Sequence, residues 1–516
     1  WYDQEPNSYP GDFGGEITTT PRNPINPGRQ RLKGQPTDKD AAGGWNQDVT
    51  QTNVQRAMRG HFFANYRERA DTQGFTRLDA GTTIAITNVD GTADEYDAAS
   101  GLDVFSIGDL VLASGFTSAA NNGLKRVTGL TGDTNVAVAE DIVDEAAPPS
   151  AARLTVVGFQ FGSGEVDVSF TGGVTRIVRA SGTKDFLDFG LIPGEAIYVG
   201  GDAAGTSFAT AANNGRKRVL SVTSTEIVID KSDAAMADET GTGLTIQIFL
   251  PARSIKNEAD PDLQVRRSYQ QERTLGSNSG DTNKQAQYVT GAVASEFALN
   301  LETASLATAD LSYIAADSET LDENNLPTNF PRTSPPVAAD AIKSESSNLG
   351  STIVPVEQAD AFNTSSDLSR IRLARVVPGN VAPDPIVGFL QSLTLNIGQN
   401  AEGNKALGVF GSFEISVGTF EVGADLTGYF SDVAAIAAVE AAEDVTLDFW
   451  QVKSNAGIVF DLPLVTVSDG RPSVEQDSPI TIPLNSAAAT GAAVDPTLNH
   501  TLMMSVFDYL PNAADS

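Results

Sequence analysis

Apolar and polar residues alternate in many short runs along this chain of 516 residues. A period of two places successive side chains on opposite faces of a β-strand, whereas an amphipathic helix needs a period of 3.6. The best-defined runs lie at 108–113, 194–199, 289–301, 393–397, 413–417, 424–430, 445–450, 457–465 and 501–507. The pattern therefore predicts a chain built almost entirely from β-strands.

A nine-residue motif occurs twice, as AANNGLKRV at 119–127 and as AANNGRKRV at 211–219. Each copy has a Phe shortly before it and an alternating run on either side. Asn and Gly tolerate positive φ, so Asn-Asn-Gly predicts a turn between two strands. The repeat predicts two small antiparallel β modules of five or six strands each, at 81–160 and 161–252.

The Lys-Arg pair that ends each motif, Lys125-Arg126 and Lys217-Arg218, has two interpretations. Paired cations can contact nucleic acid, but these two pairs begin strands inside an acidic chain. We therefore interpret them as partners for neighbouring acidic groups.

A short helix is predicted within residues 49–70. Thr50 or Thr52 can serve as its N-cap, because a hydroxyl oxygen accepts a hydrogen bond from a free backbone N–H of the first turn. Val54, Met58 and Phe62 recur with helical spacing and share one face.

Residues 432–442 also have a helical pattern. They combine good helix formers with an acidic N-cap, and their larger apolar residues are Val433, Ile436 and Val439.

A weaker symmetry links the segments 297–312 and 413–427. The first reads FALNL and later ADLS, and the second reads FEISV and later ADLT. The symmetry predicts two related hairpins within one β domain.

Residues 1 to about 50 lack apolar periodicity and are rich in Pro, Gly and Asn. Such a segment cannot bury a core of its own, so it predicts an extended arm. Four cations cluster in the middle of the arm, at Arg22, Arg29, Arg31 and Lys33. Two interpretations remain open: a disordered tail, and an arm that becomes ordered on an acidic neighbouring subunit.

The net charge of −32 and the pI near 4.3 exclude a general affinity for DNA, RNA or anionic lipid. Cysteine is absent, which excludes disulfides, thiolate metal sites and cysteine nucleophiles. The two histidines, His61 and His500, leave little room for a histidine-dependent triad, and His61 is interpreted as a residue at the edge of the core. No run approaches the ~20 apolar residues of a membrane span.

Motifs that could carry chemistry have simpler interpretations. The glycines at 200–205 have phosphate-loop spacing without the Lys, and those at 241–243 lack the third glycine of a dinucleotide site. Acidic stretches at 90–97 and 258–262 could hold calcium, but neither fits the twelve-residue calcium loop. We predict no catalytic residue, no metal site and no cofactor.

Three classes of protein remain: a structural assembly protein with an ordering arm, a secreted or surface adhesin with repeated β modules, and a glycoside-type hydrolase with two carboxylates. Three tryptophans in 516 residues weaken the hydrolase, because sugar platforms need aromatic side chains. Composition therefore favours a structural or interaction protein.

Several segments form a distinctive series along the chain. The most distinctive is FLDFGLIPGEAIYVGGD at 186–202, followed by the second copy of the repeated motif. The others are NQDVTQTN at 46–53, SIKNEADPD at 254–262, YQQERT at 269–274, YVTGAV at 288–293 and ADLSY at 309–313. In this order the segments resemble the tail tube proteins of long-tailed bacteriophages. The resemblance covers most of the chain and departs at the module 81–160.

The resemblance implies an all-β fold: a tail-tube β-sandwich or barrel with one short helix, an extended N-terminal arm and two inserted small β modules. We expect the arm at 1–50, a split tube domain at 51–80 and 253–516, and the modules at 81–160 and 161–252. Insertions are tolerated at loops, so the modules are expected to project outward.

The function implied by the resemblance is that of a virion protein in the phage tail, assembled in the host cytoplasm. Copies polymerise as stacked hexameric rings whose channel lets double-stranded DNA pass without specific binding. The implied partners are further copies of the chain, the tape measure protein, and the tail terminator and distal tail proteins, with no membrane partner.

Alternation then assigns candidate channel residues. Phe413 and Ile415 are expected to face the core, which places Glu414 and Ser416 on the opposite face. By the same argument Glu296 and Asn300 line the channel, and Arg22, Arg29, Arg31 and Lys33 make contacts between subunits.

Overall fold

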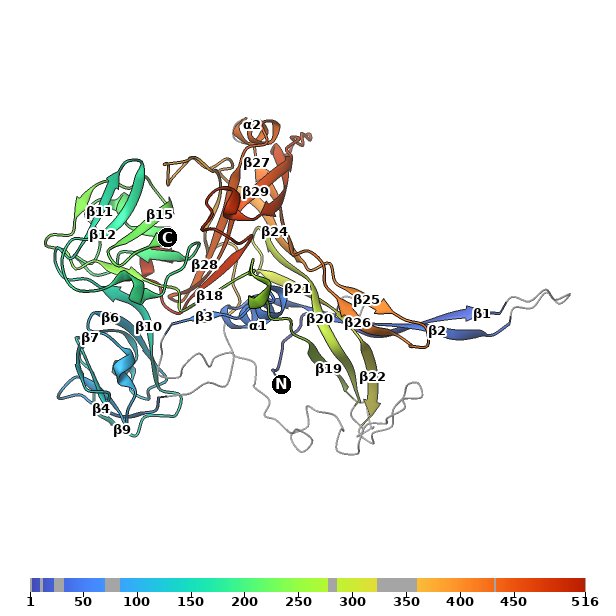
Figure 1. Ribbon diagram of the computed structural model, residues 1–516, viewed down its shortest axis with the longest axis horizontal. Helices are drawn as coiled ribbons and strands as arrows, with labels where there is room; N and C mark the ends of the chain where they lie inside the picture. The colour runs from blue at the N-terminus through green and yellow to red at the C-terminus, as the bar shows by residue number, and fades with distance from the viewer. Residues whose placement is uncertain are drawn as a thin grey trace. The chain divides into compact units, whose positions relative to one another are not determined.

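The computed structural model describes residues 2–9, 13–22, 32–69, 84–276, 285–322, 360–430 and 433–515. These residues are mostly antiparallel β-strands, with an α-helix at each of the two predicted positions, whereas the expected fold class had one (Figure 1). No sheet closes into a barrel within the described ranges. Neither described helix has the length and hydropathy of a membrane span.

The chain divides into two compact units, which do not follow the predicted domain boundaries. The first contains 1–64, 262–361 and 391–426, and the second contains 65–261, 362–390 and 427–516. How the units and modules act as domains in the assembled protein stays a prediction.

The first unit is built around one antiparallel sheet. Its strand order is β1 (Gly14–Pro21), β2 (Gly34–Asp48), β21 (Thr308–Ala315), β20 (Gln285–Glu302), β24 (Leu390–Gly398) and β27 (Glu421–Tyr429). The first half of β20 also pairs with β19 (Tyr269–Gly276) and β22 (Asp317–Asp322). A separate two-stranded ribbon contains β25 (Glu402–Lys405) and β26 (Ser412–Ser416).

Helix α1 (Gln51–His61) confirms the first predicted helix. Thr50 is its N-cap: the hydroxyl accepts from the N–H of Asn53, and the Asn53 side chain accepts from the N–H of Thr50. The predicted face is buried, with Val54, Met58 and Phe62 at most 2% exposed.

His61, at the end of α1, lies fully buried rather than at the edge of the core. Its Nδ1 is 2.9 Å from the carbonyl oxygen of Ala57, and its Nε2 is 3.0 Å from that of Glu296. Burial lowers the pKa of the imidazole, although both carbonyl contacts oppose that shift. His61 therefore joins the helix to strand β20.

Strands occur in duplicate over the two predicted modules, with seven strands in each copy instead of five or six. The first contains β4 (Ile86–Asp90), β5 (Glu95–Ala98), β6 (Asp109–Ser114), β7 (Gly123–Thr131), β8 (Asn135–Val138), β9 (Glu145–Ala146) and β10 (Arg153–Gln160). The second contains β11 (Val166–Thr171), β12 (Val174–Arg179), β13 (Ala196–Val199), β14 (Gly215–Val222), β15 (Glu226–Ser232), β16 (Glu239–Thr240) and β17 (Gln247–Phe249).

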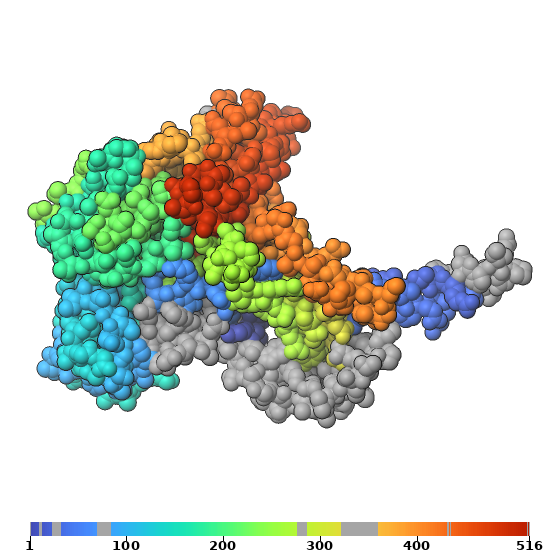
Figure 2. Space-filling view, in the orientation of Figure 1, coloured from blue at the N-terminus to red at the C-terminus, as the bar shows by residue number. Residues whose placement is uncertain are grey.

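Strand order is the same in both copies, and the two sheets join through equivalent strands. The orders are β9-β4-β5-β8-β7-β6-β10 and β16-β11-β12-β15-β14-β13-β17. Residues 158–160 of β10 pair with 247–249 of β17, so one continuous sheet runs through both modules. Figure 2 shows their surfaces in contact.

The remaining strands of the second unit form its C-terminal sheet. The order is β30 (Thr481–Ala489), β29 (Ala456–Asp469), β31 (Met503–Phe507), β18 (Arg253–Lys256) and β3 (Arg67–Glu68). β29 also pairs with β28 (Val445–Lys453), which pairs with β23 (Leu368–Arg375).

Both modules share an apolar core with this C-terminal sheet. Leu110 of the first module and Tyr198 and Phe249 of the second pack in one cluster with Trp450 and Phe507. The rings of Trp450 and Phe507 stack with centroids 5.4 Å apart. The modules are therefore packed into the second unit instead of being attached only by linkers.

Helix α2 (Ala434–Glu440) confirms the second predicted helix but differs in its cap and its buried face. The N-cap is Val433, which provides no side-chain bond, and Asp432 lies outside the described residues. The buried positions are Ala435 and Ala438, whereas Val433 is 66% exposed. Small residues allow close packing, so the largest apolar residues were a poor guide to the buried face.

The second predicted hairpin, at 413–427, is wrong. β20 and β21 pair as expected, with Phe297 opposite Leu311, but β26 pairs with β25 and β27 lies beside β24. Gly408 and Gly411 adopt φ of +84° and +97° and turn the chain directly between β25 and β26. This local closure costs less chain entropy than a longer one.

Candidate assembly surfaces

One face of the first unit's sheet is polar, and the other packs in the core. On β20, Phe297, Leu299 and Leu301 are at most 2% exposed, while Glu296 is exposed and Asn300 is partly exposed. Strands β21, β24 and β27 alternate in the same way. The alternation predicted for Glu296 and Asn300 is thus observed, while their position in a channel stays a prediction.

A hydrogen-bonded ladder crosses this polar face from strand to strand. Asp310 of β21 accepts from Asn46 of β2 at 2.7 Å and from Asn300 of β20 at 2.8 Å. Thr394 of β24 donates to the amide oxygen of Asn300 at 3.2 Å. Asn396 of β24 donates to Asp425 of β27 at 3.0 Å. We call these six residues the polar ladder: Asn46, Asn300, Asp310, Thr394, Asn396 and Asp425.

The polar face carries acidic groups and no basic ones at its described outward positions. The outward residues of β20 from Glu296, of β21, of β24 from Ser392 and of β27 up to Asp425 are Glu296, Ala298, Asn300, Glu302, Thr308, Asp310, Ser312, Ile314, Ser392, Thr394, Asn396, Gly398, Glu421, Gly423 and Asp425. A surface of this composition repels phosphate groups within about a Debye length of 8–10 Å.

Glu414 and Ser416 lie on the β25–β26 ribbon and not in the sheet that carries Glu296 and Asn300. Glu414 is exposed, and the Ser416 hydroxyl donates to the carbonyl oxygen of Glu402 at 3.4 Å. Ile415 is buried as expected, but Phe413 is 55% exposed, which corrects the assignment of Phe413 to the core. The structure therefore brings together only two of the four candidate channel residues.

The predicted arm contains a long β-hairpin. β1 pairs with β2 from Gly14 opposite Ala42 to Pro21 opposite Gly34, and residues 41–48 of β2 also pair with β21. Arg22 and Lys33 are exposed near the end of the hairpin, while Arg29 and Arg31 lie outside the described residues. Contacts of these four cations with a neighbouring subunit stay a prediction.

Ion pairs hold the base of this hairpin to its own unit. The Lys39 ammonium contacts Asp317 at 2.6 Å, and Lys405 of the β25–β26 ribbon contacts Asp38 and Asp40. The contact with Lys405 lowers the pKa of Asp38. The base of the arm is therefore fixed on the subunit that carries it.

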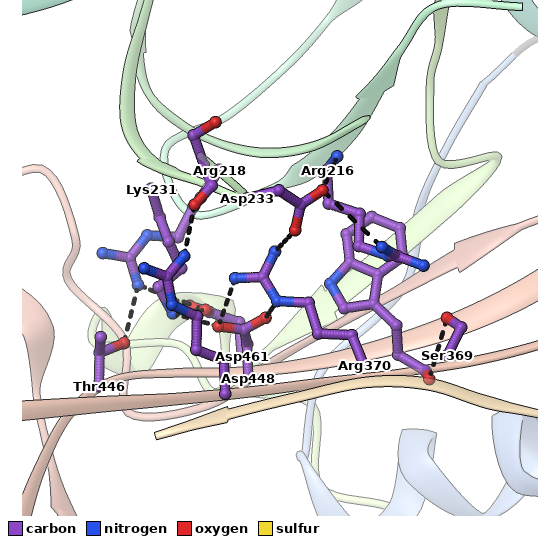
Figure 3. Close-up of polar contacts among 12 residues, drawn as sticks. Arg216, Arg218, Lys231, Asp233, Ser369, Arg370, Thr446, Asp448 and Asp461 are labelled. Atoms are coloured by element: carbon purple, nitrogen blue, oxygen red, sulfur yellow. Dashed lines mark hydrogen bonds and ion pairs between the residues drawn. The ribbon is translucent and has the colours of Figure 1, made fainter. Parts of the chain in front are cut away.

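In the second unit, a buried network of charges joins the second module to the C-terminal sheet (Figure 3). Arg218 of β14 contacts Asp230 at 2.6 Å and Asp461 of β29 at 3.0 Å. Lys231 of β15 bridges Asp461 at 2.8 Å and Asp448 of β28 at 3.0 Å. Arg370 of β23 adds ion pairs with Asp448 and Asp233.

The charges in this network stabilise one another in their ionised forms. Burial raises the pKa of Asp461, but Arg218 and Lys231 outweigh it and lower the pKa to about 2. Removing one partner of such a pair leaves a buried charge uncompensated, and the network joins the module to the sheet through Asp448 and Asp461. Arg218 confirms the interpretation of its Lys-Arg pair, whereas Lys217 donates to the carbonyl oxygens of Ala212 and Asn214.

The repeated Asn-Asn-Gly turn is held by a carboxylate that sequence reasoning missed. In the second module, Glu239 accepts from the N–H groups of Ala209 and Thr210 at 2.6 and 3.1 Å and from the Asn213 amide at 2.8 Å. Burial raises the pKa of this carboxyl, but the hydrogen bonds together outweigh it and lower the pKa.

The first module has the same arrangement around Glu145. That carboxylate accepts from the N–H groups of Thr117 and Ser118 at 2.9 and 3.2 Å and from the Asn121 amide at 2.9 Å. The described ranges contain no group of three His, Cys, Asp or Glu side chains that could hold a metal ion. In both modules the carboxylate of the shared Glu therefore holds the Asn-Asn-Gly turn in place.

The comparison with known families agrees with these features. No curated protein matches the chain significantly. The profile of the phage tail tube protein family matches residues 2–488, which include both units and both modules. The chain therefore belongs to the phage tail tube protein family, as a structural protein of the virion tail and not an enzyme.

Proposed function

We propose that copies of this chain assemble as stacked hexameric rings, and that the polar face of the first unit lines a channel for DNA. The observation that carries the proposal is the acidic face crossed by the polar ladder, with Glu296, Asp310 and Asp425 and no described basic residue. A wall for passing DNA must not bind phosphates, because each Lys or Arg contact releases counterions and adds affinity.

Assembly can use backbone groups as well as side chains. Among the described residues, strand β1 has a partner on one side only, β2, and its other side presents N–H and C=O groups that pair with no described strand. Such an edge is a liability in a monomer and an interface once a neighbouring copy pairs with it. The tape measure, tail terminator and distal tail proteins are the further partners that we propose.

The test reverses the charge of two acidic residues on the proposed channel wall. Tubes of the double variant Glu296→Lys/Asp425→Lys should form as wild-type tubes do, because both side chains point away from the core. They should hold short duplex DNA in a form protected from DNase, and the protection should fall steeply as salt rises. Negative-stain microscopy and gel analysis of the protected DNA give the two readouts.

A matched control places the same charges on an exposed loop of the second unit. The variant Glu475→Lys/Asp477→Lys changes two exposed acidic residues between β29 and β30. It should form tubes that protect no DNA. If both variants protect DNA equally, the polar face does not line the channel. If the wild-type chain forms no tubes, the proposed assembly itself is wrong.

A further inference from the structure

The turn between β25 and β26 exposes an uncharged apolar tip, which we define as residues 406–413. Leu407 is fully exposed, and Val409 and Phe413 are 46% and 55% exposed. The turn is ordered, because the N–H of Val409 donates to the carbonyl oxygen of Ala406 at 3.2 Å and Gly408 takes the positive φ that the turn needs. Large apolar side chains that stand together on a surface mark an interaction site.

Charge indicates which partner the tip accepts. Residues 406–413 read ALGVFGSF and contain no charged side chain, although the whole chain carries −32. Two copies of so acidic a chain repel each other across most surfaces, so an uncharged segment is where they can meet at the lowest electrostatic cost. A second copy of this chain is therefore the partner that the tip fits.

The same unit contains a cavity of matching chemistry. It has a volume of about 640 Å³ and is lined by the rings of Tyr9, Phe13, Trp45, Tyr269 and Tyr313, with Asp3, Arg56 and Glu272 as the charged residues of its lining. Trp45 stacks on Tyr313 with centroids 5.8 Å apart, and Tyr269 meets Tyr313 edge-on at 5.7 Å. These contacts between rings hold the cavity wall in place, and a volume of this size admits several apolar side chains.

One residue of the cavity lining has a buried oxygen that lies against Gly43. The side-chain oxygen of Gln271, which lines the cavity, is buried and accepts no hydrogen bond from the described residues. No tip residue lines the cavity of its own copy.

We propose that the apolar tip of one copy inserts into the aromatic cavity of a second copy. The proposal rests on the assembly proposed above and names the side chains that join neighbouring copies. A tip and a cavity at different places on one chain make a heterologous contact, and such contacts build rings or open filaments. Every copy then uses its tip on one neighbour and its cavity on another.

Cross-linking tests the contact directly, because the chain has no cysteine of its own. Leu407→Cys and Thr274→Cys, the latter at an exposed residue lining the cavity, are made as separate proteins and mixed before assembly. A bismaleimide should give a covalent dimer of the two variants. Leu187→Cys replaces an exposed apolar residue of the second module, 56% exposed, and should give at least tenfold less dimer with Thr274→Cys.

Assembly provides a second measurement. The double variant Leu407→Ser/Val409→Ser should melt as the wild-type monomer does and form at least tenfold fewer tubes, whereas Leu187→Ser should form them normally. Wild-type tube yield from the double variant, or equal cross-linking from Leu407→Cys and Leu187→Cys, would overturn the contact and leave the proposed assembly standing. A wild-type chain that forms no tubes would overturn both.

Discussion

At the residue scale, His500 is a buried imidazole whose two ring nitrogens have no hydrogen-bond partner among the described residues. The side chain is 1% exposed, and a Cβ on Gly194 would lie 2.3 Å from its Cε1. Burial lowers the pKa of His500 to about 3, and the attraction of Asp461 does not reverse that shift. The folded second unit therefore holds this ring in its neutral form.

Stability should consequently fall as the pH drops below the ordinary histidine pKa of about 6.5. The unfolded chain binds a proton at that pH and the folded chain does not, so the contribution of His500 is complete above 6.5 and is lost as pH falls toward 3. At pH 5 the loss is about 2 kcal/mol in the free energy of unfolding. Urea unfolding at pH 7 and at pH 5 measures it.

The matched variant is His500→Leu, which removes the titration and keeps an apolar side chain of similar size. Carboxylates and His61 titrate equally in both proteins, so their contributions cancel in the comparison. The variant should lose about 2 kcal/mol less than the wild type between pH 7 and pH 5. Identical losses would contradict a buried neutral His500.

At the element scale, the duplicated turns predict matched effects of two distant carboxylates. Glu239→Ala removes three hydrogen bonds from the turn of the second module, and Glu145→Ala removes three from the first. Hydrogen bonds to charged groups are worth about 1.5–3 kcal/mol each when buried, and these are partly exposed, so each variant should lose about 2 kcal/mol.

Amide hydrogen exchange locates the effect of these two variants. The amides of Ala209 and Thr210 should exchange faster in Glu239→Ala, and those of Thr117 and Ser118 in Glu145→Ala, each without change in the other module. Glu475→Ala, at an exposed loop residue, serves as the control and should change neither turn. Unchanged exchange in both modules would show that the carboxylates do not hold the turns.

Elements with local signals were predictable from the sequence, and those set by long-range pairing were not. Thr50 and the face of Val54 and Met58 lie within a few residues of each other, so α1 could be found. Glu145 follows Asn121 by 24 residues and Glu239 follows Asn213 by 26, so no fixed spacing revealed the shared carboxylate.

The candidate channel face, too, was predictable only where the signal lies within one strand. Alternation along β20 predicted the exposed side of Glu296 and the neighbouring Asn300, because that signal lies within one strand. Asp310 and Asp425 were missed as companions, since the order β21-β20-β24-β27 brings together strands from distant parts of the chain. Pairing of this kind depends on the register between strands, which one sequence does not reveal.

At the scale of the whole molecule, the N-terminal hairpin has a fixed base and a distal part with few described contacts. Residues 41–48 belong to the unit's own sheet, whereas Thr19 to Pro21 pair only with residues 34–36. A truncation that removes residues 1–40 would therefore also break the ion pairs of Lys39 and of Asp38. The distal part is the segment whose role in assembly can be tested without unfolding the subunit.

Deleting residues 20–35 shortens the hairpin and keeps its base, because Thr19, Pro36 and Thr37 remain to connect Thr18 with Asp38. The melting temperature of the monomer should stay the same, because the deleted strand residues pair only with each other. Tube growth should be suppressed, because a distal hairpin that binds the next subunit repeats its weak contacts around every ring.

The charge-reversal variant Arg22→Glu/Lys33→Glu should slow tube growth as well. The effect should be smaller at high salt, since exposed ion pairs contribute about 0–1 kcal/mol each and are screened. Light scattering during assembly follows both variants, and a shortened chain that polymerises at the wild-type rate would show that the distal hairpin makes no contact between subunits.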